Sequence, residues 1–303
     1  MTGDPIDGGP QWRPGRLDKL RALARRALLG TLGDRGDERL HEAYHRVLRR
    51  IGRFGPPEDD STVALLSAIA VRSRTIIDVG ANAGRYAWFL RRRARPDARL
   101  FALEPHPDAA RLLQVAVGAL PGSTVLELGA SDRDGSAGLV VPDGAFGSPV
   151  HGLAWVRAPV DNDPTGAIEI DLRRLDGLIA DGIVTVVGPV FLKIDVEGGE
   201  GRVLRGAAGL LRRHRPIIYF ECQAGPLARQ GQTPEEVWRE LVQAGYRLFA
   251  SGVAGLVPMH AVNPQVVNYL GIPDTDGPER EEPLDAAATG AMLDAWAART
   301  SRV

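Results

Sequence analysis

The chain has 303 residues, of which 44% are hydrophobic and 25% charged, the composition of an ordinary globular protein. Lysine and arginine number 37 against 38 acidic residues, and this balance argues against a dedicated nucleic-acid binder, whose binding domain is usually strongly basic. A single cysteine, Cys222, excludes an internal disulfide and a cysteine-based zinc site. No apolar run reaches the ~20 residues of a membrane span, and the first residues lack the apolar core of a signal peptide. These features predict a soluble, cytoplasmic protein.

The N-terminal region divides into a polar stretch and a helical extension. Residues 1–15 are rich in Gly, Pro and Asp, which predicts disorder. Within 16–57, apolar residues recur at helical spacing over 17–28 and again over 40–51, so two helices are expected. Residues 1–53 carry a net charge of +5. The plain interpretation is two solvated helical faces. The alternatives are a basic surface for an acidic partner, a substrate lid, or contacts between subunits of a homo-oligomer.

Between residues 58 and 260 the pattern changes to alternating strands and helices. Such alternation predicts an α/β, Rossmann-like domain built on a mostly parallel, doubly wound sheet. Strands are expected at 75–79, 99–103, 124–128, 190–196 and 216–221, and helices at 85–95, 108–120, 200–213 and 234–245.

A long excursion separates the third and fourth of these strands, and an acidic segment follows the domain. The excursion holds an expected strand at 136–141, a Gly- and Pro-rich loop at 142–166 and another strand at 167–172. Long loops in compact domains are usually functional or disordered. Residues 261–303 are interpreted as an acidic C-terminal extension, with a net charge of −4 over 271–303. We expect specificity to reside in this loop, in the N-terminal helices and in the extension.

The first strand ends in a glycine-rich turn that contains Asp78, Gly80, Asn82 and Gly84. Gly80 and Gly84 allow a tight turn and close approach of a ligand to main-chain N–H groups at the start of the next helix. The turn is not G-x-G-x-x-G, because Asn82 stands where a dinucleotide binder needs bare backbone for a pyrophosphate. Carboxylate and amide groups here suit a ligand with an amino-acid end, although the glycines could also be simple turn residues.

Acidic side chains follow the next two strands. Glu104 ends the second strand, where a carboxylate can accept hydrogen bonds from ribose hydroxyls. Ser131 and Asp132 follow the third strand, near the expected adenine edge. Each residue alone has a plain interpretation as a surface acid or a turn residue. Their order at successive strand ends favours an adenosyl ligand with an amino-acid tail, which is S-adenosylmethionine.

The fourth strand carries charges in an apolar setting. Lys193, Asp195 and Glu197 alternate with aliphatic residues, so an extended strand would place all of them on one face. Of the 37 basic residues 35 are arginine, and Lys193 is one of only two lysines. Buried charges need to pair or to bind a ligand. We expect Lys193 to pair with Asp195 or Glu197, and the alternative is an ion-pair network that only fixes the strand end.

These motifs resemble those of the FkbM-type S-adenosylmethionine-dependent methyltransferases over about residues 60–250. The resemblance implies a class I methyltransferase fold, S-adenosylmethionine as cofactor and O-methylation of a hydroxyl on a sugar or secondary metabolite. It implies cofactor roles for Asp78, Gly80, Asn82, Gly84, Glu104 and Asp132, and acceptor-side roles for Lys193, Asp195, Glu197 and Glu221. A mild departure is Gly199, where the family commonly has Ala. The resemblance rests on IIDVGANAGRYAWFL (76–90), ALEPHPDAARLL (102–113), LGASDRDG (128–135), RRLDGLI (173–179), FLKIDVEGGEGRVLRGAAGLL (191–211) and PIIYFEC (216–222).

Methyl transfer to a small-molecule hydroxyl requires a group that accepts the hydroxyl proton. The first hypothesis is Asp195 as base or hydroxyl orienter, with Lys193 orienting it or stabilising the developing alkoxide. Glu197 and Glu221 are alternates, and Mg²⁺ held by Asp195 and Glu221 is a less favoured possibility. Competing hypotheses are a nicotinamide-dependent oxidoreductase, which Asn82 disfavours, and a non-catalytic module that retains the fold.

Overall fold

The computed structural model describes residues 34–52, 54–56, 59–141, 154–157, 167–252, 255–274 and 286–301. The predicted disordered stretch 1–15, the expected helix at 17–28 and most of the loop 142–166 lie outside these residues. The N-terminal residues up to Val47 form a unit of their own, of which the structure describes 34–47, and these belong to α2 (Asp34–Arg50). This helix includes most of the second helical pattern expected from the sequence.

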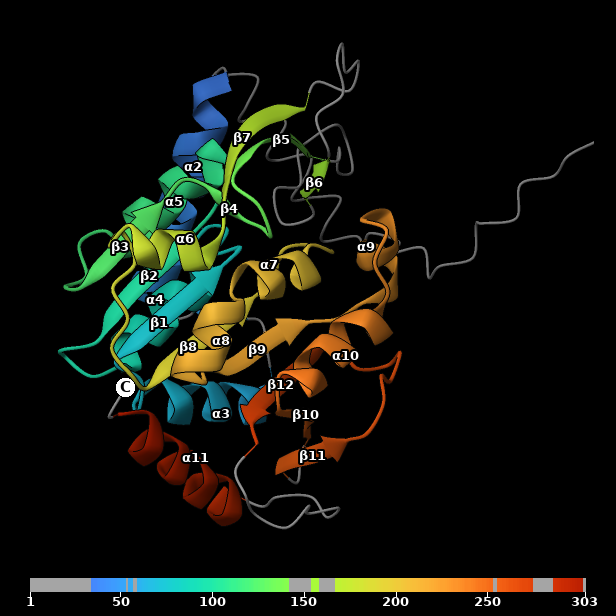
Figure 1. The fold of residues 1–303 in the computed structure, drawn as a ribbon. Coiled ribbons are helices and arrows are strands. Elements are labelled where there is room, and N and C mark those ends of the chain that lie inside the picture. The colour runs from blue at the N-terminus through green and yellow to red at the C-terminus, as the bar shows by residue number, and fades with distance from the viewer. Residues whose placement is uncertain are drawn as a thin grey trace, which may run out of the picture. The chain divides into compact units, whose positions relative to one another are not determined.

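An eight-stranded sheet forms the centre of the second unit, residues 48–303 (Figure 1). Its order is β11-β10-β12-β9-β8-β1-β2-β3, and the strands from β9 to β3 are parallel. The doubly wound, mostly parallel sheet predicted from the sequence is therefore confirmed. The strands are β1 (Thr75–Val79), β2 (Arg99–Leu103), β3 (Ser123–Leu126), β8 (Val190–Ile194), β9 (Ile217–Glu221), β10 (Tyr246–Gly252), β11 (Gly255–Met259) and β12 (Asn268–Pro273).

The antiparallel end of this sheet extends past the expected domain boundary at residue 260. Strand β12 runs antiparallel between β9 and β10, with Asn268 opposite Glu221 and Tyr246 opposite Pro273. The segment 261–303 therefore contributes a central strand to the sheet and is more than an acidic extension. The sequence analysis did not predict this strand, because the residues after 260 were assigned to an extension on the basis of their net charge.

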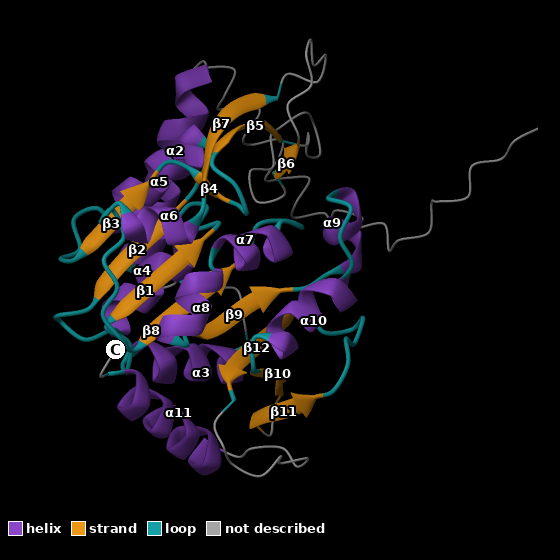
Figure 2. Cartoon of the chain, viewed as in Figure 1, coloured by secondary structure: helices purple, strands orange, loops and turns teal. Residues whose placement is uncertain are grey.

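Helices cover both faces of the sheet (Figure 2), and the buried side chains form a separate apolar core on each face. The alternation of neighbouring residues along β1 shows the division, since Ile76 packs in one core and Ile77 in the other. Every residue of β1 is buried, as expected for a strand enclosed between two helical layers. One face carries α3 (Asp60–Ala70), α4 (Arg85–Arg93), α5 (Pro107–Val117) and α11 (Ala286–Thr300); the other carries α6 (Leu175–Ala180), α7 (Glu200–Gly206), α8 (Ala208–His214), α9 (Ala224–Arg229) and α10 (Pro234–Gln243).

The excursion between β3 and β8 forms a second, four-stranded sheet of order β4-β7-β5-β6. Its small core consists of Ala137, Leu139, Ile170 and Leu172. The two expected strands of the excursion are confirmed. The strands of this sheet are β4 (Gly129–Ala130), β5 (Gly135–Val140), β6 (Trp155–Arg157) and β7 (Ile168–Arg173).

Two departures from the sequence pattern affect the site. Strand β8 ends at Ile194, so Asp195 and Glu197 belong to the turn that follows and do not share a strand face with Lys193. The helix expected at 200–213 is divided into α7 and α8 at Ala207. At this break a Cβ on Gly206 would lie 1.9 Å from the carbonyl oxygen of Ser131, so only glycine permits this contact between α7 and the end of β4.

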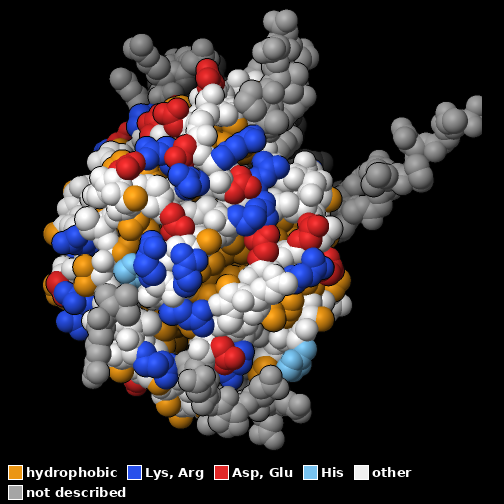
Figure 3. Space-filling view, in the orientation of Figure 1, with side chains coloured by type: hydrophobic (Ala, Val, Ile, Leu, Met, Phe, Trp, Pro, Cys, Tyr) orange, Lys and Arg blue, Asp and Glu red, His pale blue; other side chains and the backbone are white. Residues whose placement is uncertain are grey.

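A hollow lies on the outer surface of α7, α8 and α10, on the face seen in Figure 3, where apolar side chains lie beside a group of Lys and Arg side chains. Its volume is about 470 Å³, and its lining includes Leu211, Leu241 and Arg212. Within the part of the chain that the structure describes, no helix has the length and apolar character needed to cross a membrane.

Candidate active site

A cleft of about 100 Å³ lies where the carboxyl ends of the parallel strands meet the second sheet. Ligand sites of open α/β sheets occur at this edge, where the strand order reverses. In this sheet the reversal lies between β1 and β8. The turns after β1, β2 and β8 line one side of the cleft, and β5, β6 and β7 line the other with Leu139, Val156 and Leu172.

The turn after β1 is tightly folded against β2 and β8. The N–H groups of Gly80 and Ala81 both donate to the carbonyl oxygen of Leu103, at 3.0 and 2.9 Å. Gly80 has a φ of +73°, and a Cβ at this position would lie 1.8 Å from the carbonyl oxygen of Asp195. Only glycine fits here, because the turn has a left-handed backbone and is in close contact with the residues after β8. Gly80 and Asn82 both line the cleft.

Gly84 and Asp78 lie away from the cleft lining. Gly84 precedes the first residue of α4 and packs against α5, where a Cβ would meet Leu113 at 2.9 Å. Asp78 is fully buried behind the turn. Of the residues proposed for the first turn, the structure therefore brings Gly80 and Asn82 to the cleft and gives Gly84 and Asp78 supporting positions.

Glu104 connects the first and second turns. Its carboxylate accepts hydrogen bonds from the N–H of Asn82 at 2.8 Å and from the N–H of His106 at 2.9 Å. Burial raises the pKa of this carboxyl group to about 7, despite the hydrogen bonds from His106 and Asn82 that favour the charged form. Glu104 also lines the cleft, so its remaining acceptor sites are positioned for hydroxyl groups of a ligand.

Ser131, which follows β4 of the second sheet, is part of the cleft lining. Its neighbour Asp132 is directed to α7, where its carboxylate lies 3.4 Å from the guanidinium of Arg205. Asp132 is thus held in an ion pair outside the lining. The structure separates these two candidate residues, of which only Ser131 faces the cleft.

Lys193 lies at the centre of a buried network between β1 and β8. Its ammonium is 3.2 Å from a carboxylate oxygen of Asp78 and 3.2 Å from one of Asp195, and it donates to the carbonyl oxygen of Gly80 at 3.5 Å. The ring of Tyr86 lies 4.7 Å from the ammonium. Burial opposes the charge, but Asp195 and Asp78 outweigh it and raise the pKa of Lys193 above its usual value.

The expected pairing of Lys193 with Asp195 is present, and the partner missed by sequence reasoning is Asp78. Lys193 is 2% exposed and is not part of the cleft lining. A direct contact of its ammonium with an alkoxide therefore does not fit this position. Lys193 instead holds Asp195 and the Gly80 carbonyl in place from behind.

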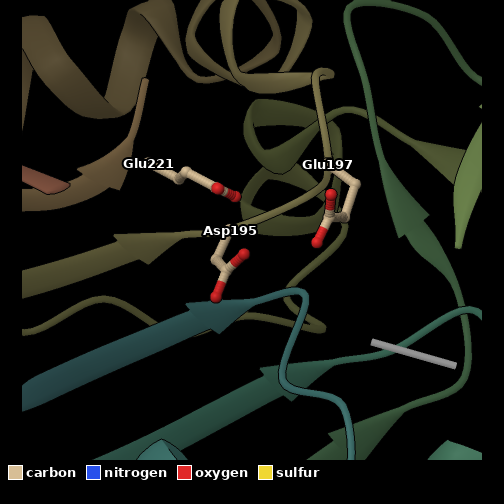
Figure 4. A group of neighbouring side chains, drawn as sticks. All are labelled: Asp195, Glu197 and Glu221. Atoms are coloured by element: carbon tan, nitrogen blue, oxygen red, sulfur yellow. The ribbon is translucent and has the colours of Figure 1, made fainter. Parts of the chain in front are cut away.

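Three carboxylates lie together at the carboxyl ends of β8 and β9, those of Asp195 and Glu197 after β8 and that of Glu221 in the last residue of β9 (Figure 4). One oxygen of each lies within 4.8 Å of the others, a spacing that a metal ion could bridge. Burial, followed by the charge of Asp195, raises the pKa of Glu197 to about 7 and that of Glu221 to about 8. Glu197 is 3.7 Å from the guanidinium of Arg229, and Glu221 accepts a short hydrogen bond from Gln223.

The turn that carries Asp195 and Glu197 is fixed by the first residue of α7. One oxygen of Glu200 accepts from the N–H of Val196 at 3.1 Å and from the N–H of Gly198 at 3.2 Å. Burial raises the pKa of Glu200 to about 7. This closed turn lets Glu197 adopt a φ of +53°.

Sequence reasoning missed two polar residues of the cleft, Arg202 and Gln230. The side-chain amide of Gln230 donates a short hydrogen bond to the carbonyl oxygen of Val156, which joins the end of α9 to β6. Gln230 belongs to none of the motifs named above, and Arg202 lies within the 191–211 stretch, to which no role was assigned at this position. Helical spacing after Gly199 is the one signal that could have placed Arg202 on the side of the cleft.

The strand order and the turns at the cleft define a Rossmann-like protein with the class I methyltransferase fold. The family model described as the methyltransferase FkbM domain matches residues 78–248. A relative, the 2-O-methyltransferase NoeI of Sinorhizobium fredii, is 30% identical over 185 residues, which are 56% of this chain and 71% of the relative. The chain belongs to the FkbM methyltransferase family.

Solved structures similar to this chain include a methyltransferase FkbM from Methylobacillus flagellatus, with 16% identity and a TM-score of 0.41. That match covers 66% of this chain and 44% of the other, so the chain spans less than half of that relative's length. A second is the O-methyltransferase from Bacillus cereus in complex with SAH, with 13% identity, a TM-score of 0.41 and coverage of 83% and 97%.

Proposed function

We propose that this protein transfers a methyl group from S-adenosylmethionine to a hydroxyl of a small molecule, a sugar or secondary metabolite. The observation that carries the proposal is the single cleft that joins the turn of Gly80 and Asn82, the carboxylate of Glu104 and the carboxylate of Asp195. Family membership and the 2-O-methyltransferase relative support the same chemistry.

The residues of the cleft fit this cofactor. Glu104 would accept hydrogen bonds from the ribose hydroxyls, since the N–H groups of Asn82 and His106 hold it at the lining. Apolar side chains of Pro105 and Leu128 would face the adenine ring near Ser131. The turn before α4 would receive the amino-acid end. The bound cofactor supplies a methyl group on a sulfonium, and the protein supplies position and a proton acceptor.

Asp195 is the proposed base. Its side chain is 39% exposed, and it lies at the cleft end of the buried network in which Lys193 fixes one of its oxygens. A hydroxyl held beside the other oxygen would lose its proton to Asp195 as the C–O bond forms. Holding the acceptor oxygen in line with the methyl group lowers the activation barrier by more than the base does, about 7–11 kcal/mol.

The test is calorimetric titration with S-adenosylmethionine, followed by mass spectrometry of hydroxylated metabolites for the gain of one methyl group. We expect Asp195→Asn to bind the cofactor normally and to lower turnover by about 10²–10⁴-fold, the usual contribution of a general base. Normal turnover in that variant would remove Asp195 as the base. Binding of NAD with no affinity for S-adenosylmethionine would refute the proposed function.

Metal dependence is tested by chelation. Asp195, Glu197 and Glu221 offer the hard oxygen ligands that Mg²⁺ prefers. We expect activity to survive EDTA, because Lys193 and Arg229 already lie close to two of these carboxylates. Loss of activity with EDTA and its recovery with added Mg²⁺ would replace this mechanism by a metal-assisted one.

A further inference from the structure

Arg202 is the one cationic side chain among the described residues that line the cleft. It lies in the first turn of α7 and is half-buried. Its guanidinium donates one hydrogen bond, at 3.2 Å, to the carbonyl oxygen of Gln230. A guanidinium has five N–H donors, so most of its hydrogen-bonding capacity is not used by the described part of the protein.

The carboxylates of the cleft do not neutralise Arg202. Glu197 is close to Arg229, at 3.7 Å, and Asp195 pairs with Lys193 at 3.2 Å. Glu104 accepts hydrogen bonds from the N–H groups of Asn82 and His106. None of these three carboxylates forms an ion pair with Arg202 in the described structure, although all of them line the same cleft. A partly buried guanidinium with unused donors is available to a ligand that supplies the counter-charge.

The surroundings of Arg202 favour a strong contact with an anion. The second sheet lines the cleft with Leu139, Val156 and Leu172, which are apolar. Hydrogen bonds to charged groups are stronger where apolar walls lower the local dielectric constant. The planar fork of a guanidinium matches two oxygens of a carboxylate or phosphate, a geometry that lysine does not offer.

We propose that Arg202 binds an oxyanion, a carboxylate or phosphate, on the methyl acceptor, so that the preferred acceptor is an anionic hydroxylated molecule. This inference rests on the proposed function. The negative charge would not come from the cofactor, because its carboxylate is expected at the turn of Gly80–Gly84 before α4, whereas Arg202 follows β8. The adenosyl part of S-adenosylmethionine carries no negative charge.

The test uses protein saturated with S-adenosylhomocysteine and two matched pairs of probes: methyl β-glucuronide with methyl β-glucoside, and glucose 1-phosphate with glucose. Calorimetry should show at least one anionic probe binding about tenfold or more tightly than its neutral partner, the effect of one charged hydrogen-bonded contact. A difference within the glucuronide pair would indicate a carboxylate on the acceptor, and a difference within the phosphate pair would indicate a phosphate. Arg202→Gln should abolish the difference, and Arg202→Lys should retain part of it.

Arg212→Gln is the matched control, because Arg212 lines the hollow on the outer surface and not the cleft. It should leave the discrimination unchanged. Equal affinity for the two probes of each pair, or no binding of any probe, would overturn the proposal for Arg202. If S-adenosylhomocysteine binds normally in the same experiment, the proposed function is unaffected. The proposal also fails if Arg202→Gln weakens the binding of S-adenosylhomocysteine and leaves the difference in affinity between anionic and neutral probes unchanged. Absence of S-adenosylhomocysteine binding by the unmodified protein would refute both.

Discussion

Lys193→Met removes the charge at the centre of the buried network and keeps most of the side-chain volume. In the native protein the ammonium is 3.2 Å from both Asp78 and Asp195. At an effective dielectric constant of about 20, each contact corresponds to about 5 kcal/mol of Coulomb attraction before desolvation is subtracted. Removing one partner of a buried pair typically destabilises a protein by about 3–5 kcal/mol. We expect a loss near the lower end, because Asp78 can take up a proton.

The expected loss depends on pH. In Lys193→Met the fully buried Asp78 keeps a proton in the native state that the unfolded chain releases near its ordinary pKa. The native state then binds more protons than the unfolded state, so the stability of the variant falls as pH rises above that pKa. Urea unfolding at pH 5 and pH 8 measures this, and the deficit relative to wild type should be larger at pH 8.

A second variant separates the ion pair from the packing. Asp78→Asn combined with Lys193→Met removes both buried charges, and it should be more stable at pH 8 than Lys193→Met alone. Lys193→Arg keeps the charge, but the larger guanidinium must fit beside the ring of Tyr86 and the carbonyl oxygen of Gly80. We expect it to lose about 1–3 kcal/mol of stability by overpacking and to slow methyl transfer. Wild-type unfolding midpoints in all three variants would refute the reasoning.

Three further outcomes follow from the cleft. Glu104→Gln should weaken S-adenosylmethionine binding by about 10–100-fold in calorimetry, because a charged acceptor for the ribose hydroxyls is lost; unchanged affinity would remove Glu104 from the cofactor site. Burial raises the pKa of Glu221 to about 8, so the native state retains a proton that the unfolded chain loses near pH 4.5. The stability of the protein therefore falls because of this group as the pH rises from about 4.5 to about 8. Glu221→Gln should flatten the decline by at most about 1.4 kcal/mol per pH unit, measured by unfolding between pH 5 and 8, and an unaltered slope would contradict the shift. Gly80→Ala places a Cβ 1.8 Å from the carbonyl oxygen of Asp195 at a φ of +73°. Thermal unfolding should therefore show a loss of stability of at least about 1–3 kcal/mol, and cofactor binding should be impaired. A wild-type melting temperature would mean that the turn is not as tight as described.

The parallel strands could be predicted well because they are short apolar runs enclosed on both faces. The observed bounds of β1 and β2 coincide with the predicted 75–79 and 99–103. The family resemblance placed the glycine-rich turn and Glu104 correctly at strand ends, since a motif at the end of a parallel strand has one edge of the sheet available to it.

The contacts between distant segments could not be predicted in the same way. Lys193 stands opposite Asp78 because β8 and β1 are paired in that register, and a single sequence carries no signal for the register of two strands more than a hundred residues apart. The prediction that the fourth strand extends to residue 196 was also wrong, because the chain turns after Ile194. Glu200 stabilises this turn by accepting hydrogen bonds from the N–H groups of Val196 and Gly198. Arg202 and Gln230 meet only after α7, α9 and β6 have assembled.

The place of β12 in the sheet has a consequence for the order in which the protein can be built during synthesis. Strand β10 (Tyr246–Gly252) leaves the ribosome before β12 (Asn268–Pro273), yet it reaches the parallel sheet only through β12, which lies between β9 and β10. Until residue 273 has emerged, β9 presents a bare hydrogen-bonding edge, and the hairpin of β10 and β11 has no strand to join. Such unpaired edges expose nascent chains to misassembly. A pause in synthesis before β12 has emerged from the ribosome would therefore prolong the vulnerable stage, whereas a pause after its emergence would leave the sheet complete.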